Sequence, residues 1–557
     1  MLISHSLLAP SLLSEAILFL PPPVPLLRPS HSSIAPDATT TASANPNLSP
    51  PVSPLQLDAH PQLSNANATP NSDPSSSPTP RLTSTLSSAS AQGPLVMGYY
   101  PDWAESSYPP ENIDFSRFDW IDFAFAVPDQ NMVLNWDGSD DAPNLLMRLV
   151  SRAHASGKHV KLSVGGWTGS KYFSSSVATS ENRAVLANNL LTLYRQYNLD
   201  GIDIDWEYPG QRGEKGNSVS PSDSANFLEF FRLLRATLPP EAKITAATQT
   251  VPFAGPDGNP MRDLSDFARV LDWVLLMNYD IWGSSSEPGP NAPLSDACSN
   301  SSQPNANALA ALRAWTAAGF APSQLVLGVP SYGYLSRSSA THLQTRALRS
   351  APRVLDSGPD PASGSGLSAL HMQIREKTHT LREWLVDVVS GLMDGSSNNK
   401  GNLVVNEDGG TDNGQVQFRE LLKQGTLQAY DSTSGAPGTD ASSANSGDRT
   451  RRTPAFTGSF SRPDAARLRA DIEDRESSRF FAGGNGFVRE WDACSNTPFL
   501  RSEGASQIVT YDDPVSLEMK AQLVRQAGML GANMFDIHGD TDEWDLTDAL
   551  RRGLGLV

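Results

Sequence analysis

Residues 200–207 read Asp-Gly-Ile-Asp-Ile-Asp-Trp-Glu, and this run is the most informative stretch of the 557-residue chain. If it forms a β-strand, Asp203, Asp205 and Glu207 share one face, because side chains along a strand alternate between two faces. The apolar residues between them fill the other face. Acidic runs often lie on solvated surfaces. In a strand buried on both sides, however, three carboxyl groups lose hydration free energy, so their presence there favours a chemical role. Crowding and burial raise the pKa of at least one of them, as a general acid requires.

Short apolar runs bounded by polar turns recur from residue 94 onward, with amphipathic stretches between them. This alternation is typical of β/α units around a parallel sheet. Eight regularly spaced candidate strands favour an α/β fold of the (β/α)8 TIM-barrel type over an open sheet. Its active site lies at the C-terminal strand ends, where Glu207 ends the fourth strand. The predicted strands are Leu95–Tyr100, Trp120–Ala126, His159–Gly165, Gly201–Glu207, Lys243–Gln249, Trp273–Tyr279, Gln324–Pro330 and Ala532–Ile537, and the clearest predicted helices are Glu181–Tyr197, Ser222–Thr237 and Val515–Leu530.

The composition changes along the chain. Residues 1–28 begin with a mostly apolar stretch that resembles a secretion signal but lacks a basic start. Residues 29–92 are rich in Ser, Thr, Pro, Ala and Asn, which predicts a disordered segment. Residues 93–557 are predicted to form the barrel, interrupted between strands seven and eight by a partly disordered insertion at 335–505. Within it, a small α+β domain is indicated by Gln415–Leu422, Gly486–Leu500 and Ile508–Asp513, whereas Thr380–Leu392 is a helical run and Ser432–Gly447 is of low complexity.

Charge and cysteine content narrow the possible partners. The formal net charge is −18 and the pI is near 4.9, so the chain offers no basic stripe for nucleic acid. No later segment is an apolar span long enough for a membrane helix, and we expect a secreted protein whose partner is an uncharged polymer. Cys298 and Cys494 each lie in an Asp-Ala-Cys-Ser-Asn pentapeptide and predict either one disulfide or two buried free thiols. The sequence carries no signal for the oligomeric state.

The run from Asp200 to Glu207 resembles the Asp-Gly-x-Asp-x-Asp-x-Glu signature of glycoside hydrolase family 18, the chitinases and their relatives. Other segments resemble the same family in the same order along the predicted strands. They are Gly98-Tyr99-Tyr-Pro-Asp-Trp103, Phe123-Ala-Phe125-Ala126, Lys161-Leu-Ser163-Val-Gly165-Gly166-Trp167, Met277-Asn-Tyr279-Asp280 and Ser331-Tyr332-Gly333.

This resemblance implies substrate-assisted hydrolysis, in which the substrate's 2-acetamido carbonyl attacks the anomeric carbon and the protein supplies an acid but no nucleophile. Glu207 is then the general acid and base. Asp205 holds the acetamido N–H, Asp203 shares a proton with Asp205, and Tyr279 donates its hydroxyl to the acetamido oxygen. Because only an N-acetylated sugar can react this way, the implied substrate is chitin or another oligosaccharide that contains N-acetylglucosamine. Neither a cofactor nor a metal ion is implied.

Further residues near the predicted strand ends are expected to bind the sugar. Aromatic rings among them can stack on sugar faces, although each ring taken alone is as consistent with core packing. The predicted substrate-binding residues are Tyr99, Trp103, Phe125, Gly166, Trp167, Met277, Asp280, Trp282, Tyr332, Met534 and Asp536.

The end of the predicted strand eight departs from the family pattern. Relatives usually carry Ala-Met-x-Trp there, and the Trp forms the floor under the sugar. Here the stretch is Ala532-Asn-Met534-Phe-Asp536, so the pattern places Asp536 at the floor, where a carboxylate cannot replace an indole by stacking. Two alternatives to a chitinase therefore stay open: an endo-β-N-acetylglucosaminidase that acts on N-glycans, and a sugar-binding lectin on the same fold, against which the presence of Glu207 argues.

Overall fold

The structure is a computed structural model that describes residues 93–344, 403–431, 462–474 and 479–557. The predicted leader at 1–28, the whole predicted disordered segment at 29–92, the helical run Thr380–Leu392 and the low-complexity stretch Ser432–Gly447 lie outside these residues. Among the residues described, no helix is both long and apolar enough to cross a membrane.

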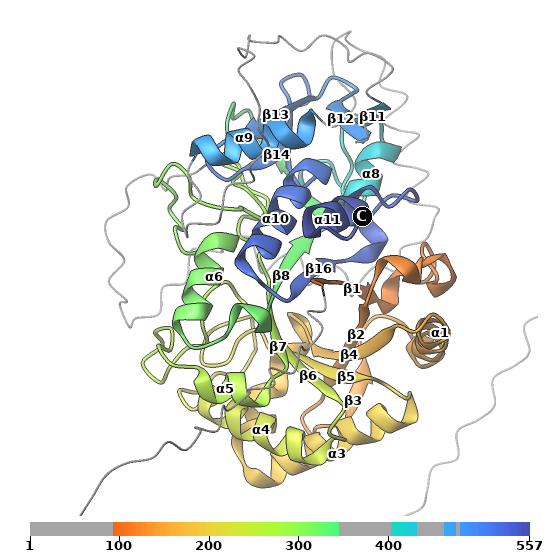
Figure 1. Cartoon of the computed structure of the whole chain (residues 1–557), viewed down its shortest axis with the longest axis vertical. Coiled ribbons are helices and arrows are strands. Elements are labelled where there is room, and N and C mark those ends of the chain that lie inside the picture. The colour runs from red at the N-terminus through yellow and green to blue at the C-terminus, as the bar shows by residue number, and fades with distance from the viewer. Residues whose placement is uncertain (1–92, 345–402, 432–461, 475–478) are drawn as a thin grey trace, which may run out of the picture. The chain divides into compact units, whose positions relative to one another are not determined.

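Within the described residues, eight parallel strands close into a barrel, which confirms the predicted (β/α)8 fold. The sheet has no open edge, because β1 pairs with both β2 and β16. Figure 1 shows the barrel strands in the interior of the ribbon with the helices around them. The barrel strands are β1 (Leu95–Pro101), β2 (Trp120–Pro128), β4 (His159–Gly165), β5 (Gly201–Asp205), β6 (Lys243–Thr248), β7 (Trp273–Leu276), β8 (Leu325–Pro330) and β16 (Gly531–Phe535), and β3 (Leu134–Trp136) pairs antiparallel with the end of β2.

The helices connect successive barrel strands, and their ends follow local sequence signals. Asp513 caps α10 by accepting the N–H of Ser516, Pro514 occupies the first turn, and Gly528 ends the helix in the left-handed conformation. The predicted helices correspond to α3, α4 and α10. The helices around the barrel are α1 (Ala142–Ala155), α2 (Phe173–Ala178), α3 (Ser180–Gln196), α4 (Asp223–Thr237), α5 (Ser265–Val270), α6 (Ala308–Ala317), α10 (Pro514–Ala527) and α11 (Asp545–Leu554).

Alternate residues of the barrel strands are buried in two different clusters. Ile202 and Ile204 of β5 are fully buried in the larger cluster, which contains the apolar side chains of the surrounding helices. The smaller cluster includes Met97, Trp120 and Trp273, and it occupies the barrel interior. Side chains that alternate with the isoleucines of β5 therefore point into the barrel, toward the site.

The segment between β8 and β16 adds a second, antiparallel sheet in the order β10-β9-β15-β14-β13, together with the strand pair β11–β12. A disulfide between Cys298 and Cys494 joins the loop after β7 to the turn between β13 and β14. Figure 1 shows α8, α9 and β11 to β14 grouped at one end of the view. The elements are β9 (Tyr332–Arg337), β10 (Asn413–Gln417), α8 (Phe418–Lys423), β11 (Leu427–Asp431), α9 (Arg462–Glu473), β12 (Arg479–Gly483), β13 (Val488–Asp492), β14 (Thr497–Ser502) and β15 (Gln507–Thr510).

Candidate active site

Two of the three carboxylates of the 200–207 run lie on the interior face of β5. Asp203 and Asp205 are 1% and 4% exposed. The third departs from the prediction: β5 ends at Asp205, so Glu207 lies just beyond the strand and is partly exposed. The reason is local, because the backbone N–H of Glu207 donates to the Ser170 hydroxyl at 2.8 Å rather than to a neighbouring strand.

Asp203 accepts hydrogen bonds from three hydroxyl groups. Tyr99 and Ser163 donate to Oδ2 at 3.0 and 2.8 Å, and Thr245 donates to Oδ1 at 2.5 Å. Ser163 on β4 and Thr245 on β6 are the direct neighbours of Asp203 in the barrel sheet. The sequence analysis assigned neither residue to the site, although the interior register of both strands would have indicated them. Hydroxyl donors from three different strands therefore hold both oxygens of Asp203 in place.

Asp205 and Glu207 hold their protons more tightly than ordinary carboxyls. Burial, followed by the charges of Glu207 and Asp203, raises the pKa of Asp205 well above its usual range, and within the described residues its Oδ1 has no hydrogen-bond partner. Burial also raises the pKa of Glu207 to about 7, opposed by a hydrogen bond from Tyr208 and increased further by the charge of Asp280. A carboxyl group with a pKa near neutrality can both donate and accept a proton, as general acid and base catalysis requires.

The loop after β7 brings Tyr279 and Asp280 to the same end of the barrel as these carboxylates. Tyr279 is buried, and burial together with the charge of Asp205 raises its pKa, so its hydroxyl stays protonated and available as a donor. Oδ1 of Asp280 accepts the hydroxyls of Tyr332 and Tyr334 at 2.6 and 2.7 Å. The contact from Tyr334 was not predicted from the sequence.

Phe535, which the sequence analysis did not select, joins the aromatic side chains of the site. Its ring centroid lies 5.2 Å from that of Tyr99 and 5.9 Å from that of Tyr279. It lies 6.4 Å from the ring of Tyr332 and 6.5 Å from that of Phe125. We call these five residues the aromatic cluster. Phe535 is partly exposed, whereas the other four members of the aromatic cluster are buried.

The structure corrects the predicted roles of Asp536 and Met534. The Asp536 side chain caps the short helix η7 (Ile537–Gly539), where its Oδ1 accepts the backbone N–H groups of His538 and Gly539 at 2.8 and 3.2 Å. Met534 is fully buried in the larger cluster between strands and helices. The physical reason is strand alternation: Met534 points out of the barrel, and Phe535 points to the interior. The interior-facing residue at the end of this strand is therefore Phe535.

The other predicted substrate-binding residues differ in their exposure and in their contacts. Trp103 is 39% exposed, with its ring 6.2 Å from that of Phe125. Gly166 has a φ of +82°, and a Cβ there would approach the Phe125 ring to 3.2 Å. Met277 is buried in the interior cluster, and the Trp167 indole N–H donates to Glu214. Trp282 lines a small hollow that also contains Cys494.

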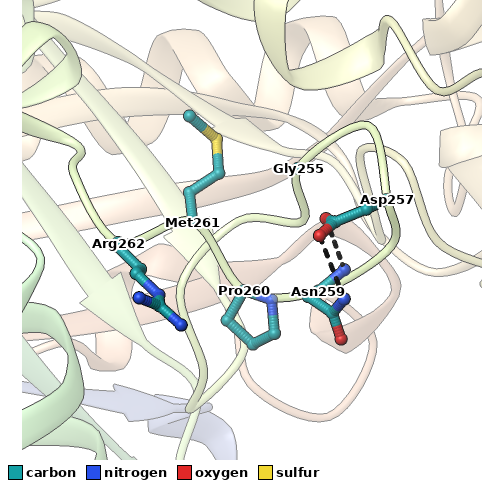
Figure 2. A pocket seen from close by; sticks show the side chains of 6 residues that line it. All are labelled: Gly255, Asp257, Asn259, Pro260, Met261 and Arg262. Atoms are coloured by element: carbon teal, nitrogen blue, oxygen red, sulfur yellow. Dashed lines mark hydrogen bonds between the residues drawn. The ribbon is translucent and has the colours of Figure 1, made fainter.

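A second hollow lies in the loop after β6 (Figure 2). Its lining runs from Gly255 to Arg262, and Figure 2 shows Asp257 tied to Asn259 by two hydrogen bonds of 3.0 Å. The six residues that line it include none of the three carboxylates. In the part of the chain that the structure describes, no group of three or more His, Cys, Asp or Glu side chains is arranged to hold a metal ion.

Comparisons with known proteins agree with this geometry. A model of glycosyl hydrolases family 18 matches residues 95–540. A chitinase-like effector of Moniliophthora roreri is 38% identical over 257 residues, which are 45% of this chain and 62% of that protein. Chitinase A1 of Niallia circulans is 28% identical over 295 residues, 43% of this chain and 42% of that protein. The crystal structure of a chitinase (RmChi1) from Rhizomucor miehei has a TM-score of 0.55 at 25% identity and covers 82% of this chain and 99% of that chain.

The chain spans about half the length of the curated relatives that it matches. The family match, in contrast, extends over nearly the whole described barrel and includes the carboxylates of β5, Tyr279 and the aromatic cluster. The chain therefore belongs to glycosyl hydrolases family 18.

Proposed function

We propose that the protein is a chitinase that hydrolyses β-1,4 linkages between N-acetylglucosamine units with retention of configuration. The observation that carries the proposal is the carboxyl of Glu207, with a pKa of about 7, beside the buried Asp205 at the C-terminal end of the barrel. The names of the relatives, chitinase A1 and chitinase RmChi1, support chitin as the substrate class.

Each side chain has a part in the proposed reaction. Glu207 protonates the departing glycosidic oxygen while the substrate's acetamido oxygen attacks the anomeric carbon, so the protein needs no nucleophile of its own. Asp205 accepts the acetamido N–H and balances the developing positive charge. Tyr279 donates to the acetamido oxygen and aims it at the anomeric carbon. Glu207 then takes a proton from the water that opens the cyclic intermediate.

Phe535 and Trp103 supply surfaces for sugar rings, whereas the other rings of the aromatic cluster are buried behind Phe535. Phe535 lies between Tyr99 and Tyr279, next to the reacting groups, whereas Trp103 is the most exposed ring and suits a sugar farther along the chain. The disulfide is typical of an oxidising compartment, so we extend the proposal to a secreted protein.

The test is to incubate the full chain with N-acetylglucosamine oligomers and colloidal chitin, beside the Glu207→Gln variant. Product lengths are followed by mass spectrometry and anomers by NMR. We expect β-anomers from the wild type, and a loss of kcat of at least about 100-fold in the variant with binding retained, because the variant lacks the acid. Products of inverted configuration, or full activity in the variant, would contradict the proposal.

A sugar-binding protein with little or no turnover is the second candidate, and Phe535 favours it. A phenyl ring offers a smaller stacking surface than the indole expected at the floor, which weakens the hold on a distorted sugar. The same experiment separates the two functions, because a lectin would bind oligomers in the wild type without releasing shorter products.

A further inference from the structure

A buried carboxyl group directly follows the first barrel strand and takes no part in the proposed reaction. Asp102 is 0% exposed, and its Oδ2 accepts the backbone N–H groups of Gly138 and Ser139 at 3.2 and 3.1 Å. Its Oδ1 has no hydrogen-bond partner within the described residues. Burial raises the pKa of Asp102 to about 7, although the backbone N–H groups lower it. Because a raised pKa means that ionisation destabilises the folded state, stability alone is a weak reason for an aspartate here.

The two backbone donors belong to the loop after β3, which packs closely against Asp102 and its neighbour Trp103. A Cβ on Gly138 would overlap Oδ1 of Asp102 and would lie 2.9 Å from Cε3 of the Trp103 indole. Only a glycine lets the backbone approach both groups so closely. One residue earlier, Oδ2 of Asp137 accepts the hydroxyl of Thr168 at 3.0 Å. The loop is therefore held between the segment after β1 and the segment after β4.

Trp103 is the exposed end of a series of aromatic rings. Its ring centroid lies 6.2 Å from that of Phe125, which in turn lies 6.5 Å from that of Phe535. The indole is 39% exposed, and Gly138 contacts it on the side of Cε3. A flat ring supports a sugar well only when its plane is fixed before the sugar binds. The contact with Gly138 supplies such a constraint.

We propose that Asp102 is a positioning residue: by holding the backbone of Gly138 against the indole of Trp103, it fixes this ring as the surface of a distal sugar subsite that favours longer oligomers. Asp102 is fully buried, so it acts through the loop after β3 and not on the sugar itself. The subsite rests on the proposed function, whereas the placement of the indole by Asp102 does not.

The first test measures affinity without hydrolysis, in the full chain that carries Glu207→Gln. Dissociation constants are determined by calorimetry for N-acetylglucosamine oligomers from the dimer to the hexamer. In Asp102→Ala the loop loses its acceptor, and we expect binding of the longest oligomers to weaken by about three- to tenfold and that of the dimer by less than about twofold, since one ring contact is lost. Gly138→Ala forces the loop away from the indole and should give the same length dependence. An equal loss at every length would overturn the proposal.

Asp129→Ala is the matched control. Oδ1 of Asp129 accepts the backbone N–H groups of Asn131 and Val133 at 2.7 and 2.9 Å, in the turn at the other end of β3. The variant therefore removes the same kind of bond from the same hairpin, and we expect no dependence of its effect on oligomer length. A length dependence like that of Asp102→Ala would overturn the proposal, because it would follow from any loosening of the hairpin.

A double-mutant cycle tests whether Asp102 acts through Trp103. In a protein that already carries Trp103→Ala, the proposed stacking surface is absent, so Asp102→Ala should weaken oligomer binding no further. Losses that add would show that Asp102 supports binding by another route, and they would overturn the proposal.

A measurement without sugar separates failure of this inference from failure of the proposed function. The fluorescence of Trp103 is the difference between the protein and its Trp103→Phe variant. We expect acrylamide to quench it faster in Asp102→Ala than in the wild type, whereas Asp102→Asn keeps an acceptor oxygen and should resemble the wild type. Equal quenching in Asp102→Ala and the wild type would overturn the role of Asp102 even in an active chitinase. Faster quenching in a protein that binds no oligomer would support this role while the proposed function fails.

Discussion

Asp205 and Asp536 are both buried aspartates at the C-terminal ends of barrel strands, and their surroundings differ sharply. Asp205 is 4% exposed, and its Oδ1 has no hydrogen-bond partner within the described residues. Asp536 is 2% exposed, and its Oδ1 accepts the backbone N–H groups of His538 and Gly539. A buried carboxylate needs donors to remain charged, and without them it retains a proton. The two carboxyl groups therefore differ in the donors that reach Oδ1, although both are buried at the C-terminal ends of barrel strands.

The largest expected effect tests this comparison directly. Asp205→Asn should lower kcat by about 100-fold or more, because an amide cannot balance positive charge at the anomeric carbon. The matched change Asp536→Asn keeps an acceptor oxygen for the backbone donors, so kcat should stay within about threefold of the wild type. Initial rates on an N-acetylglucosamine oligomer measure both. A similar loss in the two variants would remove the distinction between the carboxyls.

A second prediction concerns stability and pH at Glu207. Its pKa rises from an ordinary 4.5 to about 7 on folding, so the folded state binds the proton more tightly than the unfolded chain. This contribution to the free energy of unfolding is complete below pH 4.5 and is lost as the pH rises to about 7. Glu207→Gln cannot ionise, so its Tm should equal that of the wild type at acid pH and exceed it by a few degrees in mildly alkaline buffer. Calorimetry at the two pH values checks this, and a Tm difference independent of pH would contradict it.

The smallest predicted effect concerns the aromatic floor. Phe535→Trp enlarges the ring beside Tyr99 and Tyr279 and should change the preference for oligomer length by about two- to tenfold, in line with the modest energy of one ring contact. Asp536→Trp is the control, since it destroys the cap of η7 and should lower Tm without changing the preference. Product profiles from oligomers of several lengths measure this preference. A changed preference in Asp536→Trp, with none in Phe535→Trp, would instead assign the sugar-contacting position to residue 536.

The barrel and the inward-facing pair Asp203 and Asp205 were predictable because both depend on local periodicity. Strand β5 alternates acidic and apolar side chains, so its inner face could be read without knowing its neighbours. Strand β16 offered no such contrast, since Met534 and Phe535 are both apolar and either could face the sugar. A shift of one residue exchanges the faces of a strand, and the family pattern was aligned one position too far.

Contacts between distant strands could not be predicted in the same way. A lysine in an apolar strand gives no indication of its partner, and Asp122 meets Lys161 only because β2 and β4 are adjacent in the closed sheet. Ser163 and Thr245 bond to Asp203 for the same reason, through register across β4, β5 and β6. The sequence indicates which residues face inward, whereas barrel closure determines which of them meet.

The disulfide between Cys298 and Cys494 closes a covalent ring over a sequence separation of 196 residues, which includes β8 and the strands from β9 to β13. A protease that cuts any one peptide bond inside this ring leaves the two fragments joined. A nicked molecule would therefore migrate as one species on a denaturing gel until a reducing agent separates the fragments. One such cut would therefore not release the C-terminal strand β16 and its Phe535 from the rest of the barrel.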